Sequence, residues 1–212
     1  MNLKRELILI RHGEVDLAWK GICYGAVDVP LSNKGMDQSL QLAKLICQRW
    51  KPSEIYHSGL TRTQFLAEAI AQASPAMAQV KEDIRLRERN YGDWQGQTWD
   101  EAYATDPENF HGLIEAPDSY RPPGGESTSE MQHRAISWLM ECHTGNANGP
   151  IMAVAHSGSI ASIAGHILRL HSRDWAPWTI KTLECLSFTQ PECVDSDSQY
   201  SVERIAFDLF ET

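Results

Sequence analysis

Short apolar runs alternate with amphipathic stretches along most of the 212 residues. Residues 6–10 end in four aliphatic side chains, and residues 151–156 are almost wholly apolar. Such runs are typical of parallel strands that are buried on both faces of a sheet. Residues 32–50 carry apolar side chains at helical spacing, with Ser32 as a candidate N-cap. Further strands are predicted at 54–58, at the start of 78–86, at 185–190 and at 200–207, and further helices at 61–73, 98–106, 127–143 and 157–170.

This alternation of strands and helices predicts an α/β fold with a mostly parallel central sheet. Residues 107–125 are rich in Pro, Gly and Asp and are expected to form a loop or a lid. No repeat or linker is visible, so we expect a single domain over residues 1–212 with a lid insertion at about 97–125. Three S/T-x-x-E/Q patterns predict helix starts with capping boxes: Thr61 to Gln64, Thr98 to Glu101 and Ser127 to Glu130.

The charge balance argues against a polyanionic partner. Lys and Arg number 19 against 28 Asp and Glu, so the net charge is −9 and the pI is about 5.3. Nucleic acids and anionic membrane surfaces bind basic proteins through their phosphate groups. We therefore expect no nucleic-acid and no membrane partner, and any anion that this protein binds must be held by a local cluster of cations.

Export and metal binding are also not expected. The apolar runs are too short to span a bilayer, and the four aliphatic residues before Arg11 are too few for a signal peptide. The five cysteines are scattered without a C-x-x-C pair, which favours reduced thiols and a cytoplasmic location. Six histidines are interpreted as structural or surface residues because their spacing does not resemble a zinc site: His57, His111, His133, His143, His166 and His171.

Polar residues follow the first two predicted strands. Arg11 and His12 come directly after the first strand, and the second strand leads through Ser58 to Arg62 in the next helix. In α/β sheets, ligands bind at the carboxyl ends of the strands. We therefore expect the two arginines and His12 to lie close together at one edge of the sheet.

The strand at 151–156 ends in the same way, because His156 is followed by Ser157 and Gly158 at the start of a helix. The free N–H groups at the start of a helix bind anions. A second histidine is thus expected beside His12, next to a helix N-terminus. The cluster would suit a phosphate group.

This set of residues has the chemistry of phosphoryl transfer. Guanidinium groups match phosphate oxygens with two parallel donors and stay charged. A neutral imidazole can attack phosphorus and become a covalent intermediate, and nearby arginines would keep His12 neutral. The leaving oxygen needs a proton, for which Glu88, between Arg87 and Arg89, is the candidate.

Together these segments resemble the histidine phosphatase superfamily, the phosphoglycerate-mutase-like proteins. The resemblance covers nearly the whole chain. Any one segment is a weak signal, but the joint occurrence in the right order is specific. The segments are RHGE (11–14), CYGAVDVPLSNKG (23–35), SGLTRTQFLAEAI (58–70), LRERNYGDWQG (86–96), PGGES (123–127) and VAHSG (154–158).

The resemblance implies a three-layer αβα sandwich and a metal-independent phosphatase that needs no cofactor. It implies a phosphohistidine on His12, with Glu88 as general acid and base and His156 as a further catalytic residue. The expected substrate is a small phosphomonoester, and the expected state is a monomer or a homodimer. The phosphate-binding residues that it implies are Arg11, Arg62, Ser157 and Gly158, with His156 beside them.

Some positions depart from the family pattern. Val15 replaces a Ser or Thr, and Ala18 stands where mutases often have Asn. Val15 and Ala18 therefore lack the polar groups that the family pattern provides at these two positions. Gln95 stands where Glu is common and Thr63 where Ala is common.

The lid segment favours a phosphatase over a mutase. Mutases of the family carry basic residues there to hold a second anionic group, whereas residues 97–120 contain no Lys or Arg and six acidic residues. A phosphomonoester with an uncharged or apolar body fits better, and we expect lid aromatics to stack on it. These are Trp94, Trp99, Tyr103 and Phe110. The chain is also similar to α-ribazole phosphatases, so α-ribazole 5'-phosphate is a candidate substrate.

Alternatives remain open at this point. A phosphoglycerate mutase-type phosphoryl transferase is the nearest one. A serine esterase could use Ser157 as a nucleophile, although AHSGS lacks the glycines of a nucleophile elbow and no suitable histidine follows in order. A non-catalytic binder of phosphorylated ligands is a third alternative.

Individual residues also have simpler structural interpretations. His12 could be a hydrogen-bonded core histidine and Arg62 an exposed helix residue. Glu88 could belong to the charged run at 85–89, the lid aromatics could form a core, and Asp28 could be an ordinary turn residue.

Overall fold

Six strands form one sheet in the computed structural model, which describes residues 5–75, 78–105, 107–116, 118–142, 149–190 and 200–209. The strand order is β3-β2-β4-β1-β5-β6. Neighbouring strands from β3 to β1 pair in parallel, whereas β5 is antiparallel to both of its neighbours. The strands are β1 Leu7–Arg11, β2 Glu54–His57, β3 Gln79–Glu82, β4 Ile151–Ala155, β5 Cys185–Thr189 and β6 Ser201–Ile205.

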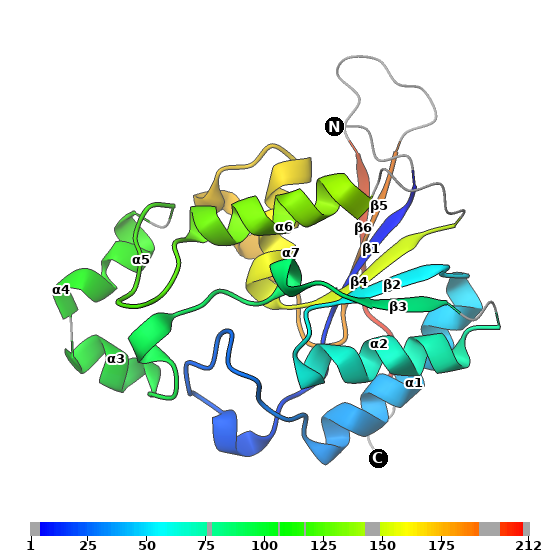
Figure 1. Ribbon diagram of the computed structural model, residues 1–212, viewed down its shortest axis with the longest axis horizontal. Coiled ribbons are helices and arrows are strands. Elements are labelled where there is room, and N and C mark those ends of the chain that lie inside the picture. The colour runs from blue at the N-terminus through cyan, green and yellow to red at the C-terminus, as the bar shows by residue number, and fades with distance from the viewer. Residues whose placement is uncertain are drawn as a thin grey trace.

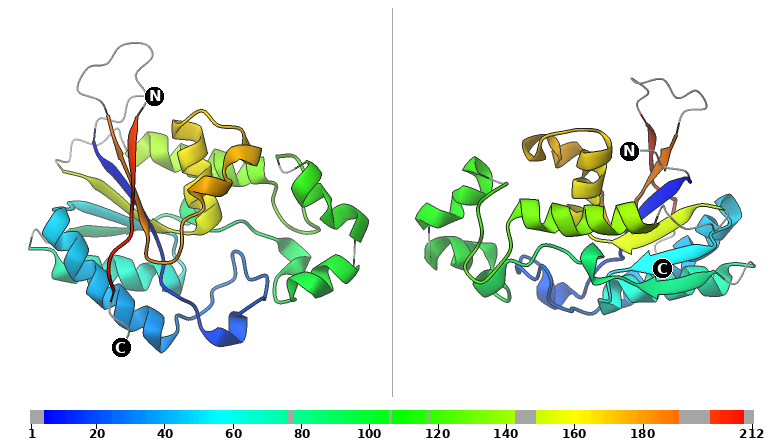
Figure 2. Two further views of the ribbon diagram at one scale, coloured as in Figure 1. Left: turned by 180° about the vertical axis from the view of Figure 1, so that it is seen from behind. Right: turned by 45° about the horizontal axis from the view of Figure 1, so that its top comes forward.

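Helices cover both faces of this sheet. In the right-hand view of Figure 2, α6 and α7 lie above the sheet and α1 and α2 lie below it. Alternate residues of β1 enter the two cores: Leu7 and Leu9 pack with α6 and α7, while Ile8 and Ile10 pack with α1 and α2. These burial patterns explain the apolar runs and confirm the predicted three-layer α/β architecture. The covering helices are α1 Asn33–Arg49, α2 Thr61–Ala73, α6 Thr128–Cys142 and α7 Ser157–Ile167.

The lid, residues 97–125, lies at one end of the molecule beside the sheet (Figure 1). It contains α3 Trp99–Thr105, α4 Pro107–Phe110 and α5 Gly112–Glu115. The expectation of a loop over 107–125 is therefore wrong for α4 and α5, which are short helices. The lid packs on a small separate apolar core, built around Ala102 from the lid and Cys23 and Trp94 from the segments beside it.

Two of the three predicted capping boxes are confirmed. The backbone N–H of Thr98 donates to the Glu101 carboxylate at 2.8 Å, and the Glu101 N–H donates to the Thr98 hydroxyl at 3.1 Å. Ser127 and Glu130 make the same reciprocal pair at 2.7 and 3.2 Å. Ser32 also caps α1, because its hydroxyl accepts from the Gly35 N–H at 2.9 Å.

The third box, Thr61 to Gln64, is wrong. Helix α2 begins at Thr61, so its N-cap is Leu60, which has no side-chain oxygen to offer. The cap comes instead from Asp28, whose carboxylate accepts from the Thr61 N–H at 2.8 Å and from its hydroxyl at 2.7 Å. Asp28 is thus more than a turn residue, since it holds the first turn of α2.

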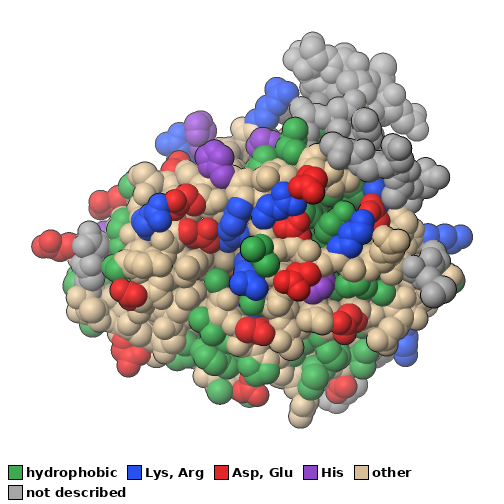
Figure 3. Space-filling view, in the orientation of Figure 1, with side chains coloured by type: hydrophobic (Ala, Val, Ile, Leu, Met, Phe, Trp, Pro, Cys, Tyr) green, Lys and Arg blue, Asp and Glu red, His purple; other side chains and the backbone are tan. Residues whose placement is uncertain are grey.

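The remaining predicted features concern the last two strands, the charged surface, the helix lengths and the cysteines. The strands expected at 185–190 and 200–207 are β5 and β6, whereas His143 and Cys193 lie outside the described residues. Basic and acidic side chains are interspersed on the face shown in Figure 3, with no broad basic surface on that face. Every helix within the described ranges is too short or too polar to traverse a lipid bilayer. The cysteines described are all free thiols: Cys23, Cys47, Cys142 and Cys185.

Candidate active site

The strand order brings three polar strand ends together. In the sheet, β4 lies between β1 and β2, so the residues that follow these strands are neighbours at the carboxyl edge. They are His12 after β1, His156 after β4 and Ser58 after β2. The convergence expected from the fold class is therefore present for the two histidines, and Ser58 joins them.

His12 is almost fully buried, with 2% of its surface exposed. Its Nδ1–H donates to the carbonyl of Gly13 at 2.7 Å, which leaves the lone pair on Nε2. Burial lowers the pKa of His12 to about 3, and the nearby guanidinium groups of Arg62 and Arg11 act in the same direction. The imidazole is consequently neutral and nucleophilic at neutral pH.

Gly13 allows this loop to lie against the start of α1. A Cβ at position 13 would come within 2.7 Å of the Ser39 hydroxyl and 2.8 Å of the Gly35 carbonyl. Any larger residue would push the loop away from α1 and move His12 with it.

His156 lies beside His12, with ring centroids 5.1 Å apart and ring planes at 62°. Its Nε2 is 2.8 Å from the hydroxyl of Ser58. Its Nδ1 is buried and has no hydrogen-bond partner among the described residues. Burial, followed by the charge of Arg62, holds the pKa of His156 well below its ordinary value.

Arg62 is completely buried and held rigidly. Its two terminal nitrogens donate to the carbonyls of Gly25 and Val27, each at 2.7 Å. Its Cζ lies 5.2 Å from the ring centroid of Tyr24. A buried cation next to two imidazoles has the location expected of a phosphate-binding arginine, rather than of an exposed helix residue.

Arg11 reaches the same region from the end of β1. It donates to the carbonyl of Ile180 at 2.7 Å, and its charge acts on both His12 and His156. Its Nε and the Nε of Arg62 are buried without a partner within the described part of the chain. Each arginine therefore keeps donor capacity beyond its carbonyl bonds.

Glu88 lies next to the start of α7. One oxygen of its carboxylate accepts from the Arg89 N–H at 2.9 Å, and the other accepts from the Gly158 N–H at 3.0 Å. Arg134 donates to the carbonyl of Glu88 at 3.0 Å and to that of Arg87 at 2.7 Å, which fixes the backbone of this segment. Glu88 is thus an ordered, half-buried residue rather than a member of a solvated charged run.

Ser157 and Gly158, at the start of α7, differ in their contacts. The N–H of Gly158, predicted to bind phosphate, is bonded here to Glu88. A Cβ at Gly158 would lie 2.4 Å from the Glu88 carboxylate, so this glycine permits the contact. Ser157 is half-buried, and across the described ranges no hydrogen bond joins it to a histidine. This geometry gives no support to a serine nucleophile.

The aromatic residues of the lid separate into two groups. Trp94 is 2% exposed and stacks near Phe110, with ring centroids 5.0 Å apart, so both belong to the core of the lid. Trp99 and Tyr103 are 37% and 43% exposed. Trp99 lines a pocket together with Glu14 and Tyr24, and the ring of Tyr24 lies beside Arg62.

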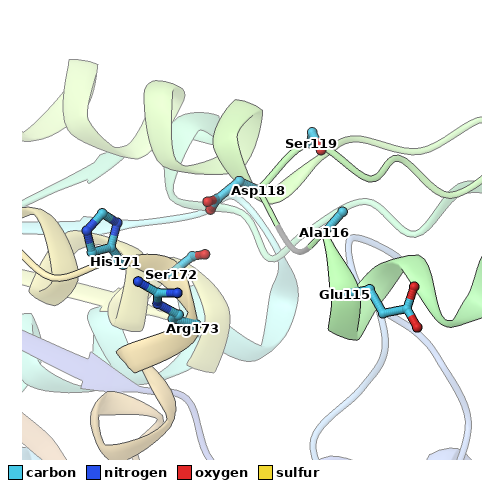
Figure 4. A pocket seen from close by; sticks show the side chains of 7 residues that line it. All are labelled: Glu115, Ala116, Asp118, Ser119, His171, Ser172 and Arg173. Carbon is cyan, nitrogen blue, oxygen red and sulfur yellow. The ribbon is translucent and has the colours of Figure 1, made fainter.

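A second pocket, of about 370 Å³, lies between α5 and the segment after α7 (Figure 4). Glu115, Asp118, His171 and Arg173 are among its lining residues, and it contains none of the predicted site residues. The described residues also contain no group of three or more His, Cys, Asp or Glu side chains placed to hold a metal ion.

Ser58 is the residue that the motif analysis did not assign to the site. It follows a strand in the same way as His12 and His156 do, and that position was the available signal. The partner of Glu88, the Gly158 N–H, could not be found from spacing because 70 residues separate the two.

Comparisons with known proteins show which family this chain resembles. The profile of the histidine phosphatase superfamily (branch 1) matches residues 7–193. The glucosyl-3-phosphoglycerate phosphatase of Mycolicibacterium vanbaalenii is 31% identical over 179 residues, which cover 81% of this chain and 77% of that protein. Phosphoserine phosphatase 1 of Hydrogenobacter thermophilus is 33% identical over 152 residues, with 72% and 71% covered. Phosphoglycerate mutase-like protein 4 of Arabidopsis thaliana is 31% identical over 159 residues, with 74% and 69% covered.

The solved structures show the same fold. The α-ribazole phosphatase from Shigella flexneri superposes with a TM-score of 0.76, covering 88% of this chain and 91% of that one. Its sequence identity is 19%, so this likeness concerns the fold alone.

Proposed function

This chain belongs to the histidine phosphatase superfamily, and we propose that it hydrolyses small phosphomonoesters through a phosphohistidine intermediate on His12. Phosphatases of the superfamily are among its relatives, which supports a phosphoric monoester hydrolase. The observation that carries the mechanism is the state of His12. Its Nδ1–H is bonded to Gly13, so the Nε2 lone pair is free, and burial beside two arginines keeps the ring neutral.

In the first step, Nε2 of His12 attacks phosphorus while the bond to the leaving alcohol breaks. Arg11, Arg62 and His156 hold the non-bridging oxygens of the phosphoryl group, whose negative charge they stabilise. Glu88, in its carboxylic acid form, gives its proton to the leaving oxygen.

In the second step, the Glu88 carboxylate takes a proton from a water molecule that attacks the phosphohistidine. The N–P bond breaks, inorganic phosphate leaves, and both His12 and Glu88 return to their first states. The two N–H donors that fix the Glu88 carboxylate, from Arg89 and Gly158, leave a lone pair on each oxygen for this proton transfer.

The proposal favours hydrolysis over mutase chemistry. A mutase must hold a second anionic group, and residues 97–120 have no Lys or Arg and six acidic side chains. Hydrolysis has to be tested against mutase activity because one relative is a phosphoglycerate mutase-like protein. If 3-phosphoglycerate is isomerised faster than aryl phosphates are hydrolysed, this part of the proposal is wrong. The free thiols are consistent with a reducing compartment, so we also propose a cytoplasmic location.

The decisive experiment compares wild type with His12→Ala on a panel of phosphomonoesters in EDTA. We expect wild type to turn over and to yield acid-labile, base-stable phosphate on the protein after quenching. His12→Ala should lose activity by about 10³-fold or more and carry no label. Label retained on His12→Ala, or activity that requires an added metal, would overturn the mechanism.

A further inference from the structure

A pocket of about 420 Å³ opens between the segment 14–24 and the start of α3. Its apolar wall includes Leu17, Trp19, Ile22 and Trp99. Leu17 is 71% exposed and Trp99 is 37% exposed. Large apolar side chains that line one concave surface and remain this exposed are typical of ligand sites.

This pocket adjoins Arg62, one of the arginines of the proposed mechanism, through the ring of Tyr24. Glu14, in its lining, is two residues from His12, and the ring of Tyr24, also in the lining, contacts Arg62. On the other side, Trp99 packs edge-on against Tyr91, with ring centroids 5.3 Å apart, and Tyr91 is three residues from Glu88. A phosphoryl group held by Arg62 would therefore lie beside this pocket.

The two walls are joined by backbone hydrogen bonds. The Cys23 N–H donates to the Gln97 carbonyl at 2.8 Å, and the Gly96 N–H donates to the Cys23 carbonyl at 2.8 Å. Ile22 and Thr98 form an antiparallel bridge between the same segments. The pocket is thus a preformed feature of the structure.

Charge in the lining opposes a second anionic group. Two carboxylates, Glu14 and Asp16, line the pocket against a single basic residue, Lys20. Both carboxylates are fixed in place, because Glu14 accepts from the Ser32 hydroxyl at 3.0 Å and Asp16 accepts from the Ala18 N–H at 2.9 Å. Like charges in such a site repel an anionic substrate body.

We propose that this pocket binds the alcohol part of the substrate, and that the substrate is a phosphomonoester of an aryl or bulky apolar alcohol. The inference rests on the proposed function and adds the substrate class to it. Trp99 and Leu17 determine specificity by burying apolar surface of the leaving group, while the phosphate is held separately at His12.

The test is a series of phosphomonoesters of increasing apolar size, from methyl through butyl and benzyl to naphthyl phosphate. In wild type, kcat/KM should rise about threefold to fourfold for each added methylene that is buried. Trp99→Ala and Leu17→Ser should flatten this dependence, with a loss of about tenfold for naphthyl phosphate and little change for methyl phosphate. Leu40→Ala, at an exposed leucine on α1, is the matched control and should keep the wild-type dependence.

A flat dependence in wild type, or an equal loss on all substrates in both variants, would overturn the pocket assignment. These outcomes differ from a failure of the mechanism. If the phosphohistidine cannot be trapped from any ester, the proposed function fails, whereas a trapped intermediate with no preference for apolar alcohols refutes only the pocket.

A separate observation concerns the proton on His156. A buried chain of hydrogen bonds runs from the Leu60 carbonyl through the hydroxyls of Thr63 and Ser58 to His156 Nε2. The successive distances are 2.8, 2.9 and 2.8 Å. This chain shares no residue with the lining of the pocket, so it carries an independent inference.

The number of hydroxyl hydrogens in this chain fixes the donor and the acceptor of each hydrogen bond. The Thr63 hydroxyl has one hydrogen, and a carbonyl can only accept, so this hydrogen goes to Leu60. The Ser58 hydroxyl must then donate to Thr63, which leaves it only as an acceptor toward His156. Nε2 of His156 therefore carries a proton, and the neutral ring has none on Nδ1, the buried atom without a partner in the described residues.

We infer that Thr63 is a positioning residue: through Ser58 it requires His156 to take up a second proton, on Nδ1, before that atom can donate to a bound oxyanion. The proton comes from solvent when the anion binds. Burial and nearby cations oppose this proton in the free protein, and the charge of the anion favours it. The charged groups that act on His156 are Arg62 from α2, Arg11 and His12 from the end of β1, and Arg134 from α6, while Glu88 binds the N–H of Gly158.

Sulfate is the probe, because it stays a dianion between pH 5 and pH 8 and its binding does not depend on turnover. In wild type, the competitive inhibition constant of sulfate should increase about tenfold for each unit by which the pH is raised, because one proton is taken up per anion bound. Thr63→Val frees the Ser58 hydrogen to donate to Nε2, so a neutral ring can carry its proton on Nδ1. The pH dependence should then become shallower.

Thr63→Ser restores the hydroxyl and should restore the wild-type pH dependence. Ser58→Ala, which also abolishes the fixed acceptor, should give the shallow dependence if Thr63→Val does not fold. Any contribution of His12 is common to all variants and cancels in the comparison. The same pH dependence in all variants, or no inhibition of wild type by sulfate, would overturn this inference.

Discussion

The body of the molecule and its lid are built in different ways. In the body, β1 and β4 are buried on both faces, and the candidate site lies where these strands end. The lid has three short helices, and its apolar core depends on Cys23 and Trp94 from outside its own helices. The candidate phosphate site is thus fixed by the main core, whereas the surface proposed for the rest of the substrate depends on local packing that can change independently.

The largest expected effect on stability comes from replacing a tryptophan in the body, compared with replacing one in the core of the lid. Trp138, in α6, is fully buried in the main core, and Trp138→Ala should lower the free energy of unfolding of the whole protein by about 3–5 kcal/mol. Trp94→Ala should lower it much less, because the lid can open while the body stays folded. Urea unfolding measures the first effect.

Hydrogen exchange measures the second effect. In Trp94→Ala, the amides of α3 should lose protection while those of β1 keep it. If both variants lower global stability equally, or if α3 and β1 lose protection together, the body and the lid form one cooperative unit and the comparison is wrong.

Glu88 connects the two regions, because its segment leads from the body into the lid. Glu88→Gln keeps the shape but removes proton transfer, so kcat should fall by about 10²- to 10³-fold. Vanadate binding should stay nearly unchanged, because vanadate is held by the cations. Glu203→Gln, at an exposed carboxylate that pairs with Arg49, is the matched control and should behave as wild type.

Gly158→Ala sharpens this prediction. The new Cβ would collide with the Glu88 carboxylate, so kcat should fall by about tenfold while vanadate still binds. An equal loss of turnover and of vanadate binding in Glu88→Gln would make Glu88 a structural residue.

Sequence reasoning succeeded where the determinants are local or depend on burial. The apolar runs of β1 and β4 and the capping boxes at Thr98 and Ser127 could be read directly from the sequence. It failed where a partner comes from a distant segment. The Thr61 to Gln64 pattern was overridden by Asp28, which is 33 residues away.

The lid and the details of the site show the same limit. The pattern over 107–125 has too few apolar positions to predict the one-turn helices α4 and α5. Phe110 of α4 and Leu113 of α5 pack against the apolar cluster that contains Trp94. Trp94 and Trp99 both suggested a substrate platform, but only burial in the folded chain distinguishes a core residue from a pocket residue. The carbonyls that bind Arg62 belong to the backbone, so no residue type in the sequence indicates them.

The body should also respond to pH through its buried histidines. The pKa of His12 is about 3 in the folded protein, against about 6.5 when unfolded. Above pH 6.5 the ring is neutral in both states and stability is unaffected. Below pH 6.5 the unfolded state binds a proton that the folded state does not, so stability falls by about 1.4 kcal/mol per pH unit until the pH approaches 3.

The lowered pKa of His156 acts with the same sign. His12→Gln should therefore reduce the loss of stability between pH 6 and pH 4 without abolishing it, as measured by urea unfolding at each pH. His133→Gln replaces an exposed imidazole on α6 and is the matched control. A pH dependence that is the same in His12→Gln as in wild type would show that His12 is not a buried neutral ring.

The smallest expected effect concerns Asp28, which caps α2 and follows the Gly25 and Val27 carbonyls that bind Arg62. Asp28→Ala should lower the free energy of unfolding by about 1 kcal/mol through loss of the helix cap, and Asp28→Asn by less, since its amide oxygen still accepts. Thr61→Ala removes one of the two donors to Asp28. The double variant should therefore lower the free energy of unfolding by less than the sum of the two single changes, because they break the same interaction.

The same segment supplies the Gly25 and Val27 carbonyls to Arg62, in the first turn of α2, so loss of the cap should also reduce kcat/KM by about twofold. Additive effects in the cycle, with unchanged kcat/KM, would show that the position of Arg62 depends on the main core alone and not on the cap from Asp28.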